Sequence, residues 1–238
     1  MAKLENDLQS IERCPICGAS SFSRGPVLWD ALVNEWELTD EQRRYIDDQQ
    51  GLCCDSCKSN LRSMTLAFAI LRTLELPGLF SDCCAHNGTL REKRVLEINE
   101  AGSLTPYLKL LPGHLLISYP EYDLQQLKLP DARFDLVVHS DTLEHIPNGL
   151  QALRECRRVL VSGGCLAYTI PIIPDRLTRS RAGLASSYHG QEATNRDDFL
   201  VHREYGSDFW GEILEAGFNN FRVYSIVYPA SLAIVAIA

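Results

Sequence analysis

Two cysteine pairs in the N-terminal quarter of the chain have the spacing of a metal site. Cys14-x-x-Cys17 and Cys54-x-x-Cys57 are separated by 36 residues. A tight Cys-x-x-Cys turn lets both sulfurs face one ion, and two such pairs supply the four thiolates that a tetrahedral structural zinc site requires. Cys53 could replace Cys54 as a ligand, but only Cys54 has the two-residue spacing to Cys57. We therefore expect structural zinc on the two pairs, with reduced thiols and no metal as the alternative.

A second group of ionisable side chains follows residues 134–140. Residues 136–138 are continuously apolar, which is typical of a buried parallel strand. Ligands of open α/β sheets bind outside the carboxyl ends of the strands, where Ser140, Asp141 and His145 would lie. His145 is the candidate general base, because neutral imidazole can accept a proton from a substrate hydroxyl or amine. A histidine that caps a helix or bonds a backbone carbonyl is the alternative.

The hydrophobic pattern predicts the strands and helices that would position these groups. Strands are expected at 94–98, 115–118, 134–140, 165–170, 221–227 and 231–237, and helices at 27–36, 39–49, 61–76, 104–111, 152–160 and 208–216. Thr39 with Gln42 three positions later predicts a capping box. Alternating strands and helices of this kind indicate an α/β, doubly wound sheet, preceded by a small N-terminal zinc-binding module.

Two consecutive segments carry a specific family resemblance. FDLVVHSDTLEHIP at 134–147 and RECRRVLVSGGCLAYTIP at 154–171 resemble the central part of class I S-adenosylmethionine-dependent methyltransferases of the type 11-like group. The resemblance extends over residues 92–238 and implies a seven-stranded Rossmann-like sheet, if a short third strand forms at Asp123. It also implies transfer of a methyl group from S-adenosylmethionine to an oxygen, nitrogen or carbon atom of an acceptor. The cysteine module resembles paired-knuckle extensions that precede some bacterial methyltransferase domains.

The resemblance assigns cofactor contacts to three loops. In the family an acid and a glycine-rich turn approach the methionine portion; Glu97 matches the acid, but Gly102 is the single glycine of this turn. Glu121 is the candidate acid for the ribose hydroxyls, with a solvated loop carboxylate as the alternative. The implied set is Glu97, Asn99, Ala101, Gly102, Tyr119, Glu121, Asp123, Leu124, Ser140 and Asp141.

The stretch 171–206 is long and polar, and long loops in compact domains usually carry function. We interpret it as a substrate lid. Three arginines within six residues, including Arg176 and Arg179, could hold a phosphate or carboxylate, with a solvated basic loop as the alternative. The expected acceptor contacts are Arg176, Arg179, His189, His202, Glu204 and Tyr205.

Length and charge narrow the function. The 238 residues suffice for an α/β core and a small module, divided as a zinc module at 1–60, a linking helix and connector at 61–91, and a methyltransferase domain at 92–238. The net charge of −8 argues against a broad nucleic-acid-binding face. No apolar run approaches the roughly 20 residues that span a bilayer and no signal peptide follows Met1, so we expect a cytoplasmic protein without membrane partners.

Three functions fit this sequence. The first is methyl transfer to a small-molecule or sugar/glycan-type acceptor. The second is rRNA methylation, because some rRNA guanine methyltransferases carry an N-terminal four-cysteine zinc module; the 6 Lys and Arg against 11 Asp and Glu in residues 1–60 argue against it. The third is an inactive methyltransferase fold that serves as a binding or scaffold protein, suggested by the loss of glycines in the turn after Glu97.

Overall fold

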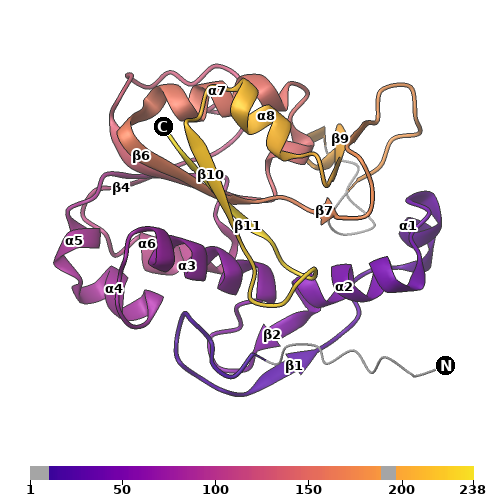
Figure 1. Cartoon of the computed structure of the whole chain (residues 1–238), viewed down its shortest axis with the longest axis horizontal. Helices are drawn as coiled ribbons and strands as arrows, with labels where there is room; N and C mark the ends of the chain where they lie inside the picture. The colour runs from indigo at the N-terminus through magenta and orange to yellow at the C-terminus, as the bar shows by residue number, and fades with distance from the viewer. Residues whose placement is uncertain (1–10, 189–196) are drawn as a thin grey trace.

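A computed structural model describes residues 11–188 and 197–238 of the chain. Its centre is a mixed sheet with the strand order β10-β11-β6-β5-β3-β4 (Figure 1). The parallel strands are β3 (Val95–Ile98), β4 (His114–Ile117), β5 (Phe134–Ser140) and β6 (Leu160–Thr169). The last two strands form the expected antiparallel hairpin: β11 (Ala233–Ile237) pairs antiparallel with both β6 and β10 (Asn220–Tyr224).

The described residues place six strands in this sheet, where the resemblance implied seven. The expected short third strand at Asp123 is absent from the described structure, because β4 is joined to β5 through turns at residues 118–133. The carboxylate of Asp123 accepts a hydrogen bond from the backbone N–H of Gln125 at 2.8 Å, which closes one of these turns. Leu124 is buried in the core beside Ile117. The prediction of a third strand was therefore wrong.

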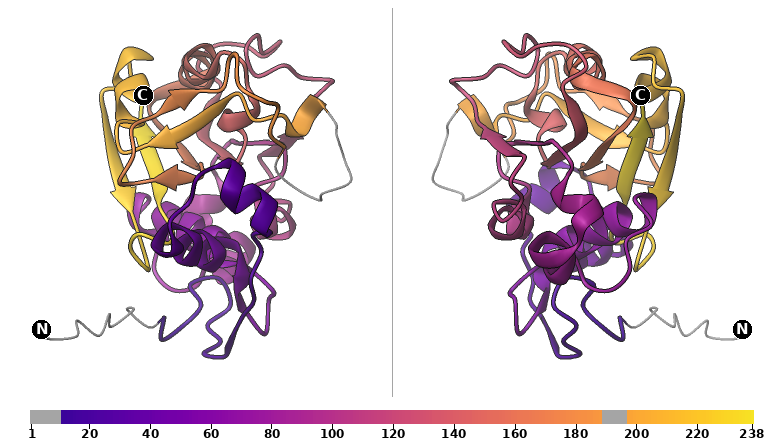
Figure 2. Two further views of the ribbon diagram at one scale, coloured as in Figure 1. Left: turned by 90° about the vertical axis from the view of Figure 1, so that its right-hand side faces the viewer. Right: turned by 90° about the vertical axis from the view of Figure 1, so that its left-hand side faces the viewer.

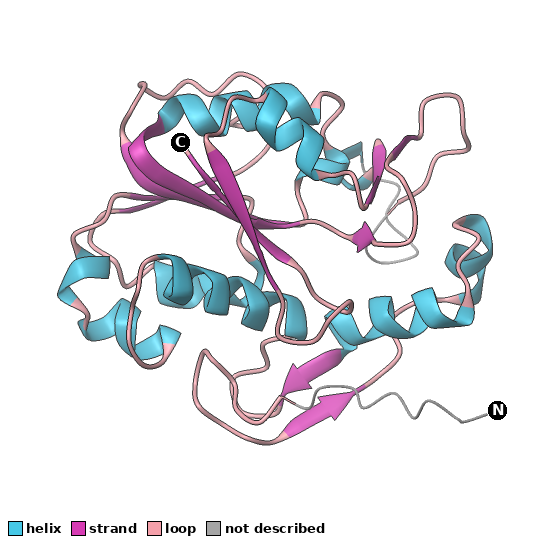
Figure 3. Cartoon of the chain, in the orientation of Figure 1, coloured by secondary structure: helices cyan, strands magenta, loops and turns pink. Residues whose placement is uncertain are grey.

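Helices cover both faces of the sheet (Figure 3). One face carries α3 (Leu61–Thr73), α4 (Phe80–His86), α5 (Gly88–Arg91) and α6 (Thr105–Leu108), and the other carries α7 (Gly149–Val159) and α8 (Trp210–Glu215). Leu136 and Val138 of β5 enter the core on the α3 side, and Val137 enters the core on the α7 side. Burial on both faces explains why this strand is continuously apolar. The segment 81–90, expected as an irregular connector, folds as helices α4 and α5.

The N-terminal module consists of a two-stranded sheet and two helices. β1 (Phe22–Arg24) pairs antiparallel with β2 (Leu52–Cys54), and α1 (Asp30–Glu35) and α2 (Asp40–Gly51) lie between them in sequence. The predicted capping box is confirmed: the Thr39 hydroxyl accepts from the Gln42 N–H at 3.2 Å, and the Gln42 side chain accepts from the Thr39 N–H at 3.0 Å. The cap fixes where α2 begins.

The segment after β6 folds into a small sheet beside the end of that strand (Figures 1 and 2). β9 (Arg203–Gly206) pairs parallel with β7 (Ile172–Ile173) and antiparallel with β8 (Arg179–Ser180). The left view of Figure 2 shows α1 and α2 of the N-terminal module, in indigo, below this small sheet. None of the described helices is long and apolar enough to cross a membrane.

Candidate active site and metal centre

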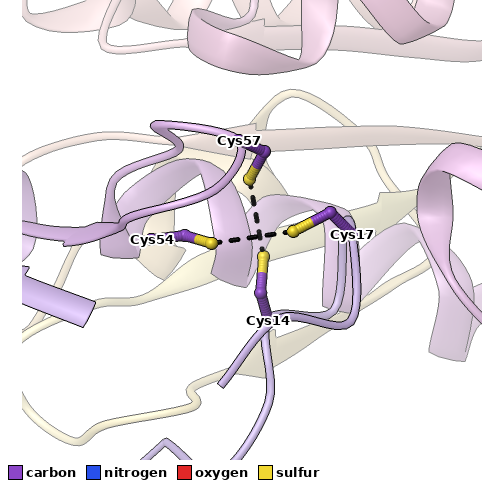
Figure 4. A group of neighbouring side chains, drawn as sticks. All are labelled: Cys14, Cys17, Cys54 and Cys57. Carbon is purple, nitrogen blue, oxygen red and sulfur yellow. Dashed lines mark hydrogen bonds between the residues drawn. The ribbon is translucent and has the colours of Figure 1, made fainter. Parts of the chain in front are cut away.

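The four cysteines of the two pairs point their sulfurs toward one centre (Figure 4). The Sγ atoms of Cys14 and Cys57 are 3.7 Å apart and those of Cys17 and Cys54 are 3.6 Å apart, and all four lie within 4.8 Å of one another. A tetrahedral zinc site with Zn–S bonds of about 2.3 Å has sulfur–sulfur separations of about 3.8 Å. The donor set therefore fits a tetrahedral zinc ion. Cys53 lies outside it, because its thiol faces the backbone carbonyl of Gln50 at 3.5 Å.

The two cysteine turns have the same backbone geometry. The N–H of Gly18 donates to the Cys14 carbonyl at 2.8 Å, and the N–H of Lys58 donates to the Cys54 carbonyl at 2.9 Å. Gly18 and Lys58 both have positive φ, at 80° and 60°. This conformation suits the glycine and costs the lysine some backbone energy, so the second turn depends more on its surroundings.

Helix α3 connects this cysteine cluster to the carboxyl ends of β3 and β5. Cys57 Sγ lies 3.2 Å from the Ser59 hydroxyl, and the next residue, Asn60, caps α3 by accepting from the Ser63 N–H at 2.9 Å. Within the first turn of α3, Arg62 pairs with Asp141 at the end of β5. The Ser63 hydroxyl accepts from the Ser103 N–H at 3.3 Å in the loop after β3. Helix α3 thus contacts both loops at this edge of the sheet.

Hydrogen bonds to the Glu97 side chain hold the loop after β3 in place. Its side chain is fully buried; Oε1 accepts from the Ala101 N–H at 2.7 Å and from the Thr105 hydroxyl at 2.5 Å, and Oε2 lies 2.7 Å from His114 Nε2. Burial by itself raises the pKa of Glu97, but these hydrogen bonds outweigh it and hold the pKa below its usual range. Glu97 is an ionised acceptor that closes the turn.

The turn that follows Glu97 has a left-handed backbone, although its sequence contains a single glycine. Asn99, Glu100 and Gly102 have φ values of 55°, 56° and 58°. A Cβ on Gly102 would lie 2.7 Å from the Ser63 hydroxyl oxygen, so a side chain here would force Ser63 to shift, and the φ of 58° disfavours it as well. The Asn99 side chain accepts from the Tyr119 N–H at 2.9 Å, which ties the β3 loop to the β4 loop. The two loops form one continuous edge, on which Asn99, Glu100 and Tyr119 are exposed.

The end of β5 carries a chain of hydroxyl and carboxyl groups. The Ser140 hydroxyl donates to Thr169 at 2.8 Å, and the Thr169 hydroxyl donates to Asp141 at 3.2 Å. Asp141, with φ 44°, is thereby held between β6 and Arg62 of α3. Its carboxylate faces the same crevice as the loop after β3, because β3 and β5 are parallel neighbours in register from Val95 to Ile98.

Glu144 and His145 follow in the 3₁₀ turn Leu143–His145. Among the described residues neither carboxyl oxygen of Glu144 has a hydrogen-bond partner, and the side chain is 1% exposed. Burial raises the pKa of Glu144 well above its ordinary value, and the Asp141 carboxylate adds to the effect. His145 Nδ1 lies 3.1 Å from the Leu200 carbonyl, so Nδ1 carries the hydrogen and Nε2 faces Glu144 at 3.7 Å. Burial lowers the pKa of His145 and favours the neutral ring.

Comparison with known proteins shows which protein family this part of the chain matches. Residues 78–168, which run from just before α4 to the last residue but one of β6, match the family described as Methyltransferase domain. This part of the chain is similar to a methyltransferase domain. The resemblance to class I S-adenosylmethionine-dependent methyltransferases that the sequence indicated is confirmed for it.

Individual relatives match smaller parts or match weakly. A "Probable S-adenosylmethionine-dependent methyltransferase" of Mycolicibacterium smegmatis is 36% identical over 64 residues, which are 25% of this chain and 25% of that protein. A solved S-adenosylmethionine-dependent methyltransferase from Thermotoga maritima is 16% identical, covers 87% of this chain and 96% of its own, and has a TM-score of 0.45. A solved methyltransferase from Methanosarcina mazei is 14% identical, covers 62% of this chain and 92% of its own, and has a TM-score of 0.38.

The methyltransferase domain brings most of the predicted cofactor residues to one edge. Glu97, Asn99, Ala101 and Gly102 form the β3 loop, Tyr119 is bonded to it, and Ser140 and Asp141 end the neighbouring strand. Glu121 and Asp123 are exposed in the turns after β4. Sequence analysis did not single out Arg62 and Ser63, since nothing in the helical pattern of α3 indicates that its first turn reaches two loops far away in sequence. The roles of all these residues toward a cofactor stay predictions.

Most of the residues predicted to contact the acceptor form hydrogen bonds or ion pairs within the chain. Glu204 is buried and pairs with Arg181 and with Arg179, whose Nε lies 2.6 Å from Oε2. Arg176 donates to the Trp36 carbonyl at 2.7 Å. The Tyr205 hydroxyl donates to Glu212 at 3.4 Å. The backbone N–H of His202 donates to the Glu144 carbonyl at 2.8 Å. His189 lies outside the described residues. Contacts of these side chains with an acceptor remain predictions.

Proposed function

We propose that the chain binds S-adenosylmethionine at the carboxyl ends of β3, β4 and β5 and transfers its methyl group to a small-molecule acceptor. The observation that carries this proposal is the turn after β3: an ionised, buried Glu97 holds a left-handed loop whose Gly102, with φ 58°, packs against the Ser63 side chain of α3. Such a turn lets the backbone approach a ligand closely. It lies inside the part of the chain that matches the methyltransferase domain family.

The residues at this edge have separate proposed tasks. Tyr119 binds the nucleoside side of the donor, and the loop at Asn99 together with Ser140 and Asp141 binds its methionine side. When bound, S-adenosylmethionine supplies a methyl carbon whose bond to sulfur breaks as the acceptor's lone pair bonds to it, which leaves S-adenosylhomocysteine. His145 takes the proton that a hydroxyl or ammonium acceptor must lose, because a neutral imidazole whose Nδ1 donates to the Leu200 carbonyl accepts a proton at Nε2.

The four cysteines are proposed to bind zinc in a structural role. All four positions of a tetrahedral ion are filled by thiolates, so the ion has no open position for a substrate. Its proposed task is to hold the turn from which α3 starts, and thereby to keep Arg62 and Ser63 against the two loops.

Formation of S-adenosylhomocysteine tests this proposal. Zinc-loaded protein is incubated with S-adenosylmethionine and panels of phenols, amines and sugars, and the homocysteine product is quantified. We expect turnover with at least one panel, and a loss of about 10²-fold or more in kcat for His145→Asn, since general-base catalysis contributes factors of this size. The exposed His86→Asn is the control and keeps the wild-type rate. Cofactor binding without turnover on any panel would instead support the scaffold alternative.

The rRNA alternative has its own test. Binding of rRNA fragments is measured by filter retention at low and high salt, because phosphate contacts make affinity fall steeply with salt. The acidic N-terminal module predicts no salt-sensitive binding. Tight, salt-sensitive retention would replace the small-molecule proposal.

A further inference from the structure

A cavity of about 270 Å³ lies between the N-terminal module and the segment that follows β6. On the module side it is lined by aromatic side chains of α1 and α2, namely Trp29, Trp36 and Tyr45. On the other side it is lined by Ile172 and Ile173 of β7. Trp36 and Ile173 also belong to a small apolar cluster of their own, separate from the two clusters that flank the main sheet. The cavity is therefore built jointly by two parts of the chain that are more than 100 residues apart.

The cavity lies at the same edge as the proposed methyl-donor site. Its wall begins at Pro171, two residues after the end of β6 at Thr169. The Thr169 hydroxyl is hydrogen-bonded to Asp141, which faces the loop after β3. Figure 1 shows β7 directly beyond the end of β6, with α2 below β7. An acceptor in this cavity would thus lie beyond the strand ends, where ligands of open α/β sheets bind.

Polar contacts hold the two walls together without entering the cavity. The Gln42 amide donates to both oxygens of Asp175 at 2.9 and 2.8 Å. Arg176 donates to Gln42 Oε1 at 2.8 Å, and Arg181 pairs with Glu35 at 3.0 Å. These contacts join α1 and α2 to the segment 171–188. A cavity whose walls are fixed in this way is largely formed before a ligand arrives, which lowers the ordering cost of binding.

The lining restricts what the cavity can bind. All described side chains that line it are uncharged, although the whole chain carries a net charge of −8. The polar groups among them are the amides of Gln49 and Gln50, the indole N–H groups of Trp29 and Trp36, and the Tyr45 hydroxyl, which is 3.5 Å from Asp175. The Trp36 indole N–H donates to the Ser187 hydroxyl at 2.9 Å. A sugar would lose many hydrogen bonds to water here and regain few, at a cost of about 1–3 kcal/mol for each unpaired group. Flat aromatic rings instead gain from stacking and edge contacts with tryptophan and tyrosine.

Size narrows the ligand further. An apolar cavity of about 150 Å³ accommodates one benzene ring. A cavity of about 270 Å³ therefore accommodates about two fused rings.

We propose that this cavity is the acceptor-binding site and that it takes a neutral, planar aromatic ring system of about two fused rings. The inference rests on the proposed methyl transfer and names its acceptor class. For a phenolic acceptor, the hydroxyl oxygen gains the methyl group and loses its proton to His145 or to water, and S-adenosylhomocysteine is released. Trp29, Trp36 and Tyr45 would then be walls of the acceptor site.

Calorimetric titration with 2-naphthol tests the inference, with methyl glucoside as the sugar probe and S-adenosylhomocysteine as the probe of the donor site. Val27 lies at the rim and is 39% exposed, so Val27→Trp fills the cavity without disturbing a buried position. Val223 on β10 is 43% exposed and does not line the cavity, so Val223→Trp is the matched control. We expect 2-naphthol to bind wild type and the control alike and at least tenfold more weakly to Val27→Trp, with unchanged S-adenosylhomocysteine binding in all three.

The outcomes separate this inference from the proposed function. Absence of 2-naphthol binding in protein that binds S-adenosylhomocysteine would overturn the inference and leave the proposed function standing. Binding of methyl glucoside in place of 2-naphthol would overturn the aromatic class. Equal 2-naphthol affinity of both tryptophan variants would place the ligand elsewhere. Absence of S-adenosylhomocysteine binding would overturn the proposed methyl transfer, and the acceptor role of the cavity with it.

Discussion

His139 gives a quantitative test of how the central strand is buried. It lies on β5, is 0% exposed, and its two ring nitrogens have no hydrogen-bond partner among the described residues. The ring stacks against Tyr168 with the ring centres 4.9 Å apart. Burial lowers the pKa of His139 from 6.5 to about 3. The folded protein therefore holds this ring neutral at pH values where the unfolded chain protonates it.

The sign of the pH effect follows from this depressed pKa. Above pH 6.5 both states hold a neutral ring, and the full stability is present. As the pH falls from 6.5 toward 3, the unfolded chain takes up a proton that the folded chain excludes, and stability is lost. Each pH unit costs about 1.4 kcal/mol, so the loss between pH 7.5 and pH 5 is about 2 kcal/mol.

Replacing the His139 ring removes this pH-dependent loss of stability. We expect His139→Leu to lose about 2 kcal/mol less stability than wild type between pH 7.5 and pH 5, measured by urea unfolding at both pH values. His86→Leu, at an exposed position of α4, is the control and keeps the wild-type pH dependence. An identical loss in His139→Leu and wild type would refute the reasoning, because it would mean that the ring can be protonated inside the fold.

Three further predictions concern the site and its supports. Glu144→Gln should gain stability over wild type by about 1.4 kcal/mol for each pH unit above 4.5 until the carboxyl ionises, because a buried acid with a raised pKa costs stability as pH rises; thermal melts from pH 5 to 8 measure this. Cys54→Ser should lower the zinc content from about one ion per chain to near zero by mass spectrometry, whereas Cys53→Ser should retain it. Arg181→Met should cost about 3 kcal/mol in urea unfolding, because it removes one of two partners of the buried Glu204 carboxylate; a loss below about 1 kcal/mol would contradict the structural role.

The predictions that succeeded are those that depend on local pattern. The strand Phe134–Ser140 was predicted at its observed bounds, because a run of apolar residues between polar ones has one plausible packing in an α/β fold. The Thr39 capping box and the preference for Cys54 over Cys53 also follow from spacing alone. In each case the physical requirement is met by residues within one short segment of the chain.

The features that sequence reasoning missed depend on contacts between distant segments. Arg62 is an ordinary helix residue in sequence, and its pairing with Asp141 appears once α3 is docked on the sheet. Trp36 looks like a core residue, and in the fold it also lines a cavity. The arginines of the segment after β6 form a cluster in sequence, but the structure uses Arg179 and Arg181 together on Glu204. Charge spacing along a chain cannot show which charges meet across it.

The central claim is that the loop after β3 binds the methyl donor, and calorimetric titration of zinc-loaded protein with S-adenosylhomocysteine tests it most directly. Gly102→Ala places a Cβ 2.7 Å from the Ser63 hydroxyl, whereas Gly163→Ala shares the positive φ but has open space around it. We predict one binding site per chain, at least tenfold weaker binding in Gly102→Ala, and wild-type binding in Gly163→Ala. Folded, zinc-loaded wild-type protein that binds neither S-adenosylhomocysteine nor S-adenosylmethionine would contradict the claim.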